Sequence, residues 1–308
     1  MTLDAPAFDS LIPIRTIPDR ASFDLLVARE TGPRLAVETL LLKDQGMTAP
    51  RRVRRWRGTE QAPLHRLAGY CRICGIAVHF TLPGTEAGAP ANFREALLCA
   101  DCGLNNRQRF MASHALELLQ SRGKDSTLYA YEQATAFFDR IRERLGDRVV
   151  GSEYLGPDVL PGQVKNGVRH EDATSLSFRD SSFDVLVSNN VFEHVPDIEA
   201  TLSEARRVLR PGGTLLFTVP FHGTDATEQR AALVADTVQH LSSPEYHGDP
   251  VRPREGSLVF YHFGWDLLQY CRNAGFSTAA MIVYDSVLFG HMGDGLQYAF
   301  RADVAADT

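Results

Sequence analysis

The sequence lacks an apolar run long enough to cross a membrane, and its start lacks the charged-then-apolar pattern of an export signal. Two acidic residues, Asp4 and Asp9, stand there instead. These absences argue against a membrane-spanning or secreted protein, so we expect a cytoplasmic protein with no membrane partner. Positive charge is not in excess either. The net charge of −6 argues against nucleic acid as the partner of the whole chain.

The sequence also lacks the G-x-G-x-x-G fingerprint of dinucleotide-binding folds, which argues against a nicotinamide-dependent oxidoreductase. Cysteine is scarce, with five in 308 residues. Hydrophobic residues make up 44% and charged residues 23%, an ordinary globular composition. The length allows about two domains, or one domain with a small module attached.

Four of the five cysteines form two C-x-x-C pairs, and Gly75 and Gly103 follow the pairs directly. Each pair can lie on one tight turn, and two such turns can surround one ion tetrahedrally. Four thiolates favour Zn²⁺ and leave no open position, so we expect a structural zinc. Four free thiols, a redox pair and an iron–sulfur cluster remain as alternatives, although the usual cluster spacings differ. The expected ligands are Cys71, Cys74, Cys99 and Cys102.

Three regions follow from the pattern along the chain. Residues 1–60 are a helical or linker segment, with apolar stretches at Phe23–Val37 and Leu40–Leu42. Their arginine-rich run, residues 51–57, fits either a solvated face or a phosphate contact. Residues 61–123 are a zinc-ribbon-like module and a connecting helix. We expect Asn105 or Asn106 to cap this helix, and Arg122–Asp125 to end it.

Residues 124–308 alternate strands with helices, which predicts an α/β domain with a parallel sheet. A polar insertion interrupts the alternation at about 221–264. The expected strands are Thr127–Tyr131, Arg148–Gly151, Val168–His170, Phe183–Ser188, Thr214–Val219, Phe276–Tyr284 and Leu296–Arg301. The expected helices are Phe137–Leu145, Ile198–Leu209 and Trp265–Ala274.

Two acidic residues follow predicted strands. Nucleotide-type ligands bind at the carboxyl ends of parallel strands, where a carboxylate commonly takes the ribose hydroxyls. Glu153 follows the second strand of the domain, and Asp172 follows the third. Each carboxylate is equally compatible with a surface position or a helix cap.

The order of several segments carries more information than either carboxylate. Residues 172–178, 182–188, 191–197 and 207–214 read DATSLSF, SFDVLVS, VFEHVPD and RVLRPGGT. This succession is similar to class I S-adenosylmethionine-dependent methyltransferases of the type 11-like group, over about residues 126–302. The resemblance implies a Rossmann-like, seven-stranded, mostly parallel sheet whose last strand is antiparallel. It also implies S-adenosylmethionine as cofactor, with Glu153 on the ribose, Asp172 and Ala173 near the adenine, and Asn189 or Asn190 near the methionine part.

The sequence departs from this family in the loop after the first strand. The family has a glycine-rich loop there, whereas Glu132–Ala136 contains no glycine. Each Cβ narrows the space for a ligand. We expect Glu132 to meet the positively charged methionine end, with Ala134 and Thr135 also lining the cofactor. The alternative is a site that no longer binds it.

Histidines supply the candidates for proton transfer. His194 follows the fourth strand, where it can act as a base or simply shape the turn. In the insertion, which caps the active site in the resembling family, His247 with Asp249 can form a base and its orienting group, or a second metal site. Ordinary surface histidines are the alternative.

Two functions remain open at this point. The first is a methyltransferase for a small-molecule or sugar-type acceptor. The second is a non-catalytic, degenerate methyltransferase-like protein whose zinc module and arginine-rich run contact a macromolecule. The sequence leaves open the acceptor, the atom methylated and the oligomeric state.

Overall fold

A computed structural model of the chain describes residues 14–27, 65–83, 92–235, 237–293 and 296–307. The arginine-rich run, most of the apolar lead-in and most of the loop between the cysteine pairs lie outside the described residues. Of the lead-in, residues 20–27 are helical. In the described part, no helix has the length and apolar character needed to span a membrane.

The chain divides into two compact units. One consists of Met1–Ser113 and Ile282–Tyr298, and the other of His114–Met281 and Ala299–Thr308. Helix α3 and strands β17 and β18 contribute residues to both.

The first unit contains a three-stranded antiparallel sheet that carries the four cysteines. Its strands are β2 (His65–Cys71), β3 (Ile76–Leu82) and β4 (Leu98–Cys99), and the short helix α2 (Phe93–Ala96) precedes β4. Leu67 and Phe80, which lie opposite each other on β2 and β3, are buried. Position 69 requires glycine, because the Leu288 backbone lies close to it. A Cβ at Gly69 would lie 2.5 Å from the Leu288 carbonyl oxygen.

Helix α3 (Asn106–Arg122) confirms the predicted connecting helix and its end. The Asn105 side chain accepts from the Gln108 amide at 2.8 Å, and the Gln108 side chain accepts from the Asn105 amide at 3.2 Å. This reciprocal pair satisfies two amide groups at the helix start, so Asn105 is the cap. The apolar residues that predicted the helix are buried: Phe110, Met111, Ala115, Leu118 and Leu119.

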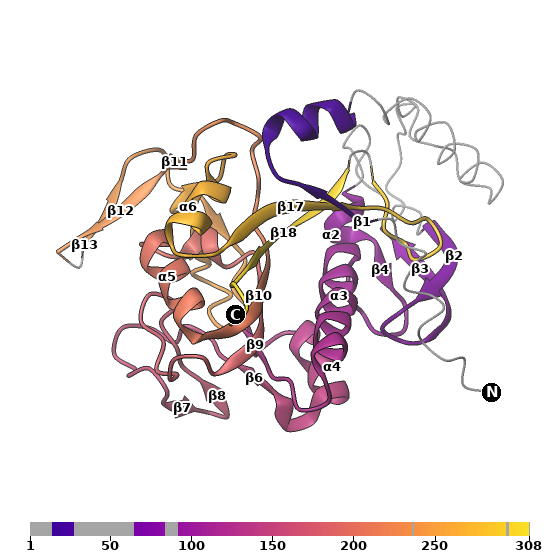
Figure 1. Cartoon of the computed structure of the whole chain (residues 1–308), viewed down its shortest axis with the longest axis horizontal. Coiled ribbons are helices and arrows are strands. Elements are labelled where there is room, and N and C mark those ends of the chain that lie inside the picture. The colour runs from indigo at the N-terminus through magenta and orange to yellow at the C-terminus, as the bar shows by residue number, and fades with distance from the viewer. Residues whose placement is uncertain (1–13, 28–64, 84–91, 236, 294–295, 308) are drawn as a thin grey trace. The chain divides into compact units, whose positions relative to one another are not determined.

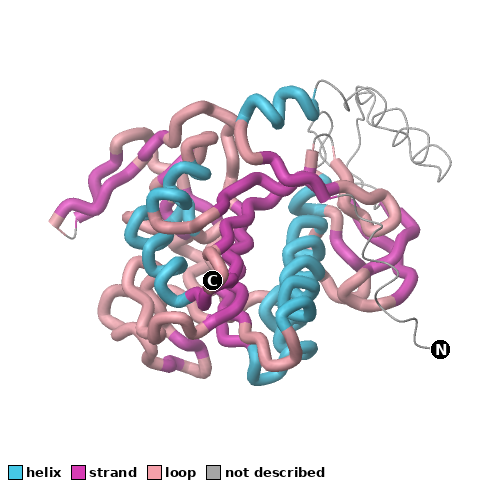
Figure 2. Tube along the Cα trace, viewed as in Figure 1, coloured by secondary structure: helices cyan, strands magenta, loops and turns pink. Residues whose placement is uncertain are grey.

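A seven-stranded mixed sheet has the order β1-β17-β18-β10-β9-β5-β6 (Figures 1 and 2). β9 pairs in parallel with β5 and β10, β5 pairs in parallel with β6, and β18 is antiparallel to β10. These pairings confirm the predicted parallel core, the central place of Phe183–Ser188 and the antiparallel last strand. The strands are β1 (Ile14–Ile17), β5 (Leu128–Ala130), β6 (Val149–Gly151), β9 (Phe183–Asn189), β10 (Leu209–Thr218), β17 (Thr278–Tyr284) and β18 (Gln297–Asp303).

The expected third strand of the domain is not one of these seven. Val168–His170 forms only the two-residue β8 (Val168–Arg169), which pairs with β7 (Val164–Lys165), while one bridge joins His170 to Glu153. The reason is the turn Asn166-Gly167, where both residues have positive φ, 53° and 80°. Asn-Gly favours a tight hairpin, so the chain pairs locally. β1, which the sequence analysis did not predict, is the seventh strand.

Helices α4 (Ala136–Leu145), α5 (Ile198–Val208) and α6 (Leu267–Asn273) confirm the three predicted helices of the domain. Thr135 and Asp197 cap the first two, accepting from the Phe138 and Ala200 amides. Figure 1 shows α5 and α6 on one face of the sheet and α4 on the other. The insertion forms three small strand pairs, made of β11 (Glu228–Gln229), β12 (Ala231–Val234), β13 (Thr237–His240), β14 (Tyr246–His247), β15 (Ser257–Leu258) and β16 (Tyr261–His262).

Candidate functional site

Four polar residues meet where β5, β6 and β9 end, and we call them the strand-end cluster: Glu132, Thr135, Glu153 and Asn189. Because these strands are parallel, their carboxyl ends share one edge of the sheet. The Asn189 side-chain amide donates to Glu132 Oε1, and the Thr135 hydroxyl donates to Glu132 Oε2, both at 2.5 Å. Glu132 itself is buried. The structure therefore brings together three residues that sequence reasoning assigned to one ligand.

Glu153 is held by the loop that lacks glycine. Its Oε1 accepts from the backbone amides of Gln133 at 2.7 Å and Ala134 at 2.6 Å. Within the described residues, its Oε2 accepts no hydrogen bond. Burial raises the pKa of Glu153, although the two amides oppose the shift. One oxygen thus fixes the side chain, and the other stays available to a ligand.

The loop needs no glycine for its own backbone conformation. None of the described non-glycine residues between Tyr131 and Ala136 has a positive φ. Close packing instead requires a glycine on the neighbouring strand. A Cβ at Gly151 would lie 2.6 Å from the Glu132 carbonyl oxygen and 2.4 Å from the Phe138 ring. Sequence reasoning missed Gly151 because it sought the glycine in the loop.

Asp172 and Ala173 lie in a turn after β8. Asp172 Oδ1 accepts from the Thr174 amide at 2.8 Å and from the Thr174 hydroxyl at 2.7 Å. Asp172 Oδ2 accepts no hydrogen bond from the residues that the structure describes. Asp172 therefore combines a turn-forming oxygen with one that has no protein partner, as Glu153 does.

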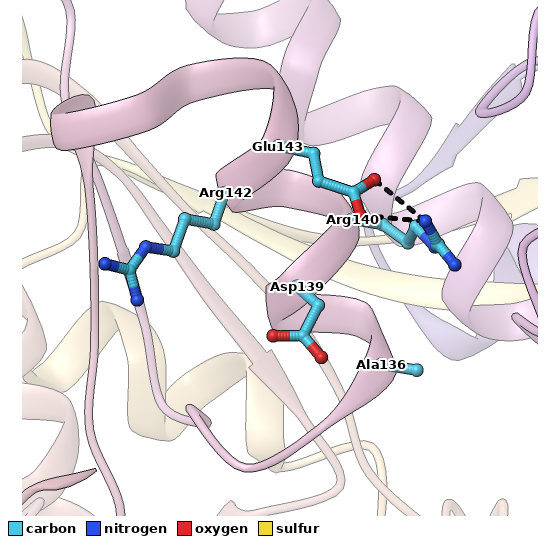
Figure 3. A pocket seen from close by; sticks show the side chains of 5 residues that line it. All are labelled: Ala136, Asp139, Arg140, Arg142 and Glu143. Atoms are coloured by element: carbon cyan, nitrogen blue, oxygen red, sulfur yellow. Dashed lines mark hydrogen bonds and ion pairs between the residues drawn. The ribbon is translucent and has the colours of Figure 1, made fainter. Parts of the chain in front are cut away.

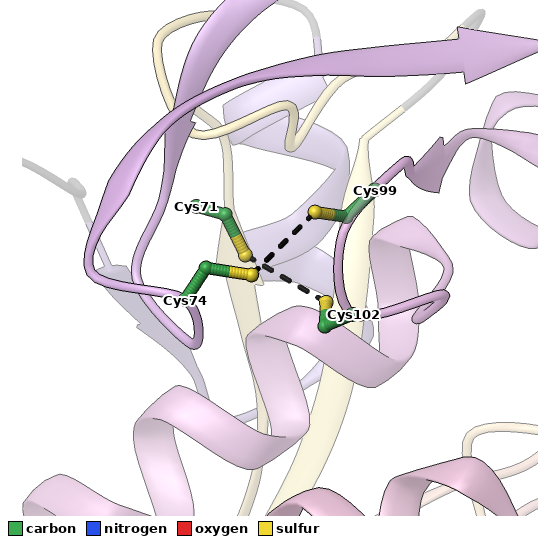
Figure 4. Close-up of side chains that lie close together, drawn as sticks. All are labelled: Cys71, Cys74, Cys99 and Cys102. Carbon is green, nitrogen blue, oxygen red and sulfur yellow. Dashed lines mark hydrogen bonds between the residues drawn. The ribbon is translucent and has the colours of Figure 1, made fainter.

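The four cysteines lie together in the first unit (Figure 4). The Sγ atoms of Cys71 and Cys102 are 3.8 Å apart, as are those of Cys74 and Cys99. Bonds of about 2.3 Å to a central tetrahedral ion would separate the sulfur atoms by about 3.8 Å. A disulfide requires about 2.0 Å, so these four described cysteines form no disulfide with one another.

Both turns of this four-cysteine cluster have the predicted form. The Gly75 amide donates to the Cys71 carbonyl at 2.8 Å, and the Gly103 amide donates to the Cys99 carbonyl at 3.0 Å. The two glycines have φ of 73° and 75°, which other residues rarely adopt. The same local geometry at both pairs fits a site with one metal ion.

The structure brings His194 and His247 together but gives Asp249 separate partners. The two imidazole centroids are 5.0 Å apart. Asp249 accepts from the Arg252 backbone and guanidinium and from the Ser257 hydroxyl. In the described part of the chain, no hydrogen bond joins Asp249 to His247. Burial lowers the pKa of His194, whose Nδ1 lies 2.9 Å from the Leu258 carbonyl.

Sequence reasoning missed two carboxylates beside these histidines. Glu193 lies completely buried, 3.7 Å from His194 Nε2 and 3.8 Å from His247 Nδ1. Glu245 lies 3.2 Å from His247 Nε2 and 2.8 Å from His262 Nε2. The adjacency of Glu193 and His194 in the sequence was the available signal for the first. Nothing in the spacing of Glu245 pointed to the second.

A hollow of about 360 Å³ lies along the exposed side of α4 (Figure 3). Charged side chains surround it, and Arg140 forms an ion pair with Glu143 at 2.8 Å. It contains no residue of the strand-end cluster, so we do not connect it with the candidate site. Its lining residues are Ala136, Asp139, Arg140, Arg142 and Glu143.

Comparison with known proteins places the strand-end cluster within a matched segment. Residues 112–217 match the family described as "Methyltransferase domain". An uncharacterized methyltransferase of Mycobacterium sp. (strain KMS) is 34% identical over 150 residues, covering 44% of this chain and 58% of the relative. Malonyl-[acyl-carrier protein] O-methyltransferase 1 of Coxiella burnetii (strain RSA 493 / Nine Mile phase I) is 32% identical over 167 residues, covering 50% and 55%.

A solved structure of an S-adenosylmethionine-dependent methyltransferase from Mesorhizobium loti aligns with 61% of this chain and 96% of its own. The sequence identity is 14% and the TM-score is 0.36. The chain spans a little over half the length of the two curated relatives. Over residues 112–217, the chain is therefore similar to the methyltransferase domain family.

Proposed function

We propose that this protein is an S-adenosylmethionine-dependent methyltransferase acting on a small-molecule acceptor. The observation that carries the proposal is the strand-end cluster, with its oriented Glu153, inside the segment that matches the methyltransferase domain. A carboxylate already fixed by two amides loses little conformational freedom when it binds a ribose hydroxyl, which favours binding.

The residues of this edge fit the parts of the cofactor. Glu153 Oε2 would accept from the ribose, and Asp172 Oδ2 would accept from the adenine amino group, with Ala173 beside it. The Glu132 carboxylate, positioned by Asn189 and Thr135, suits the positively charged methionine end. Ala134 is small enough to leave room at the loop. The cofactor supplies an activated methyl group on a sulfonium.

The protein's own contribution would be alignment and proton transfer. His194 keeps one ring nitrogen on the Leu258 carbonyl, and its lowered pKa favours the neutral, proton-accepting form. His247 lies beside it and is half-buried. Either ring could take the proton of an acceptor hydroxyl. A small hydroxyl-bearing acceptor, sugar types included, fits this arrangement.

The acceptors named for relatives are larger or more apolar than a sugar. One relative is named for a malonyl-[acyl-carrier protein], and another, from Mycobacterium ulcerans (strain Agy99), for phthiotriol and phenolphthiotriol dimycocerosates. We keep a small-molecule acceptor as the proposal, with a lipid-linked one as the outcome that an acceptor screen would reveal.

We further propose that the four-cysteine cluster binds one structural Zn²⁺. The sulfur separations of 3.8 Å support this, because they match the edge of a tetrahedron around zinc. Four thiolates fill the coordination sphere, so this ion would hold the fold and take no part in methyl transfer.

Calorimetry with S-adenosylmethionine and S-adenosylhomocysteine tests the proposed cofactor. We expect both ligands to bind at about one per chain, because one strand-end cluster exists in the described domain. Absence of binding at millimolar ligand would contradict the proposal and leave the non-catalytic alternative.

A further inference from the structure

Three side chains of the second unit form a compact group that the proposed cofactor site does not use. Glu193 and His194 end the short helix η4 (Phe192–His194), and His247 lies on β14 of the insertion. One potential ligand atom from each residue lies within 4.8 Å of those of the other two. We call Glu193, His194 and His247 the histidine cluster.

Within the described part of the chain, the Glu193 carboxylate accepts no hydrogen bond of ordinary length, and its exposed fraction is 0%. Its partners are the two imidazoles, which form long ion pairs with it. The nearest nitrogens, 3.7 and 3.8 Å away, are well beyond the ~2.8 Å of a charge-assisted hydrogen bond. A buried carboxylate that has only such long contacts is poorly compensated for its lost hydration. A metal cation bound directly to the carboxylate would compensate it better than the imidazoles do at these distances.

Both imidazoles present a nitrogen to this carboxylate and hold the other nitrogen on an acceptor. His194 Nδ1 lies 2.9 Å from the Leu258 carbonyl oxygen, so Nε2 faces Glu193. His247 Nε2 lies 3.2 Å from a Glu245 oxygen, so Nδ1 faces Glu193. In the neutral ring, an acceptor on one nitrogen fixes the proton there and leaves the lone pair on the other. Glu193 and Glu245 raise the pKa of His247, so a metal ion at Nδ1 would displace a proton. Metal-binding histidines have this arrangement, with a carbonyl or carboxylate holding the distal N–H.

We propose that Glu193, His194 and His247 bind a divalent transition-metal ion. Two imidazoles and one carboxylate suit zinc, iron, cobalt or manganese. Around an ion with bonds of about 2.1 Å, ligand atoms lie about 3.0 to 4.2 Å apart, depending on the angle. The measured 3.7 and 3.8 Å fall in this range, whereas a shared proton would require shorter contacts.

Three protein ligands leave coordination positions open. The open site differs from the closed four-cysteine cluster and can take a water or an oxygen of a small molecule. On the proposed function, and resting on it, this oxygen belongs to the methyl acceptor. The ion would then acidify the acceptor hydroxyl, and His194 and His247 would be its ligands in place of acting as bases. η4 follows β9 along the chain, so Glu193 lies four residues after Asn189 of the strand-end cluster.

Titration with Co²⁺ tests the metal site without any cofactor. Full-length protein is first given one equivalent of zinc, which four thiolates bind in preference to two imidazoles and a carboxylate, and any excess is removed by dialysis. It is then titrated with Co²⁺ and followed by absorption and equilibrium dialysis. We expect about one equivalent to bind, with visible bands that lack intense thiolate charge transfer. Failure of the wild-type protein to bind Co²⁺ would overturn the proposal, whatever calorimetry with S-adenosylmethionine gives.

Variants identify the ligands. His247→Ala and Glu193→Gln should each weaken Co²⁺ binding at least about tenfold. His240→Ala, an exposed histidine of the same insertion, should bind like wild type. Glu193→Gln removes the buried charge, so the metal-free variant should unfold at a temperature no lower than wild type. Equal Co²⁺ affinity in all three variants would also overturn the proposal.

Discussion

Glu153 is the residue on which the account of the candidate site depends most. Its two oxygens have different roles: one binds two amides of the preceding loop, and the other has no protein partner among the described residues. The amides that a glycine-rich loop would direct at a ligand are here directed at the protein's own carboxylate. The loop can therefore lack glycine and still hold in place the side chain that we propose to bind the ribose.

We predict that Glu153→Gln weakens S-adenosylhomocysteine binding about tenfold or more, because one charged hydrogen bond contributes about 1.5 to 3 kcal/mol. The glutamine carbonyl still accepts from both amides, so the loop should keep its structure. Calorimetry measures the affinity, and circular dichroism checks the fold. Glu143→Gln, an exposed change on α4, is the matched control.

The same variant has a predicted effect on stability. Burial raises the pKa of Glu153, so its contribution to stability is fully present below the unfolded pKa and is lost as pH rises through the folded pKa. At pH 7 the ionised side chain therefore opposes folding. Glu153→Gln should unfold at an equal or higher temperature at pH 7, and this difference should shrink near pH 4. A variant that loses both stability and affinity at pH 7 would indicate a purely structural Glu153.

Part of the site could be predicted from single residues. Glu132 and Glu153 were placed correctly after strands of one sheet, because strand ends are visible in the apolar pattern. Asn189, with Asn190 as its alternative, came from the family resemblance. Glu193 and Glu245 were missed, because their importance comes from a three-dimensional contact with the insertion. Asp249 looked like the partner of His247 by spacing, yet its hydrogen bonds organise its own turn.

At the scale of elements, the alternation of strands and helices was predictable because each element has its own apolar periodicity. The hairpin β7–β8 was not predicted, because the strands were predicted from apolar residues alone and the Asn166-Gly167 turn was not considered. Two polar side chains of α5 also stabilise a neighbouring segment by hydrogen bonds, which the sequence pattern does not indicate. Arg207 donates to the Leu176 and Phe178 carbonyls, and Glu204 accepts from the Leu176 amide. These hydrogen bonds stabilise the segment that follows Asp172.

Removal of the metal from the cysteine-bearing sheet tests whether zinc stabilises this sheet. We predict at least one equivalent of zinc in protein purified without added metal, and about one equivalent less in Cys99→Ser. The variant should also unfold at a lower temperature, because its turns lose their common ion. Atomic absorption and thermal unfolding measure the two effects.

Cys271 provides the control for this experiment. It is buried but lies outside the four-cysteine cluster, so Cys271→Ala should keep the zinc content of wild type. Wild-type protein that is folded but holds less than about half an equivalent of zinc would contradict the structural role.

At the scale of the whole molecule, the chain combines a cysteine-bearing unit with a methyltransferase-like sheet. The topology of this sheet followed from the resemblance, with two exceptions: the expected third strand is not part of the sheet, and β1 adds a strand beside β17, at the edge opposite β6. β1 comes from the lead-in, whose strand of four residues is too short to stand out in the sequence. The proposed function depends on this sheet, because we propose that its strand-end cluster binds S-adenosylmethionine.

A crystal structure of the full chain with S-adenosylhomocysteine tests that claim most directly. We predict a ribose hydroxyl within about 3 Å of Glu153 Oε2 and the amino-acid end beside Glu132 and Asn189. Ligand bound elsewhere on the chain, or a strand-end cluster without ligand at saturating concentration, would contradict it.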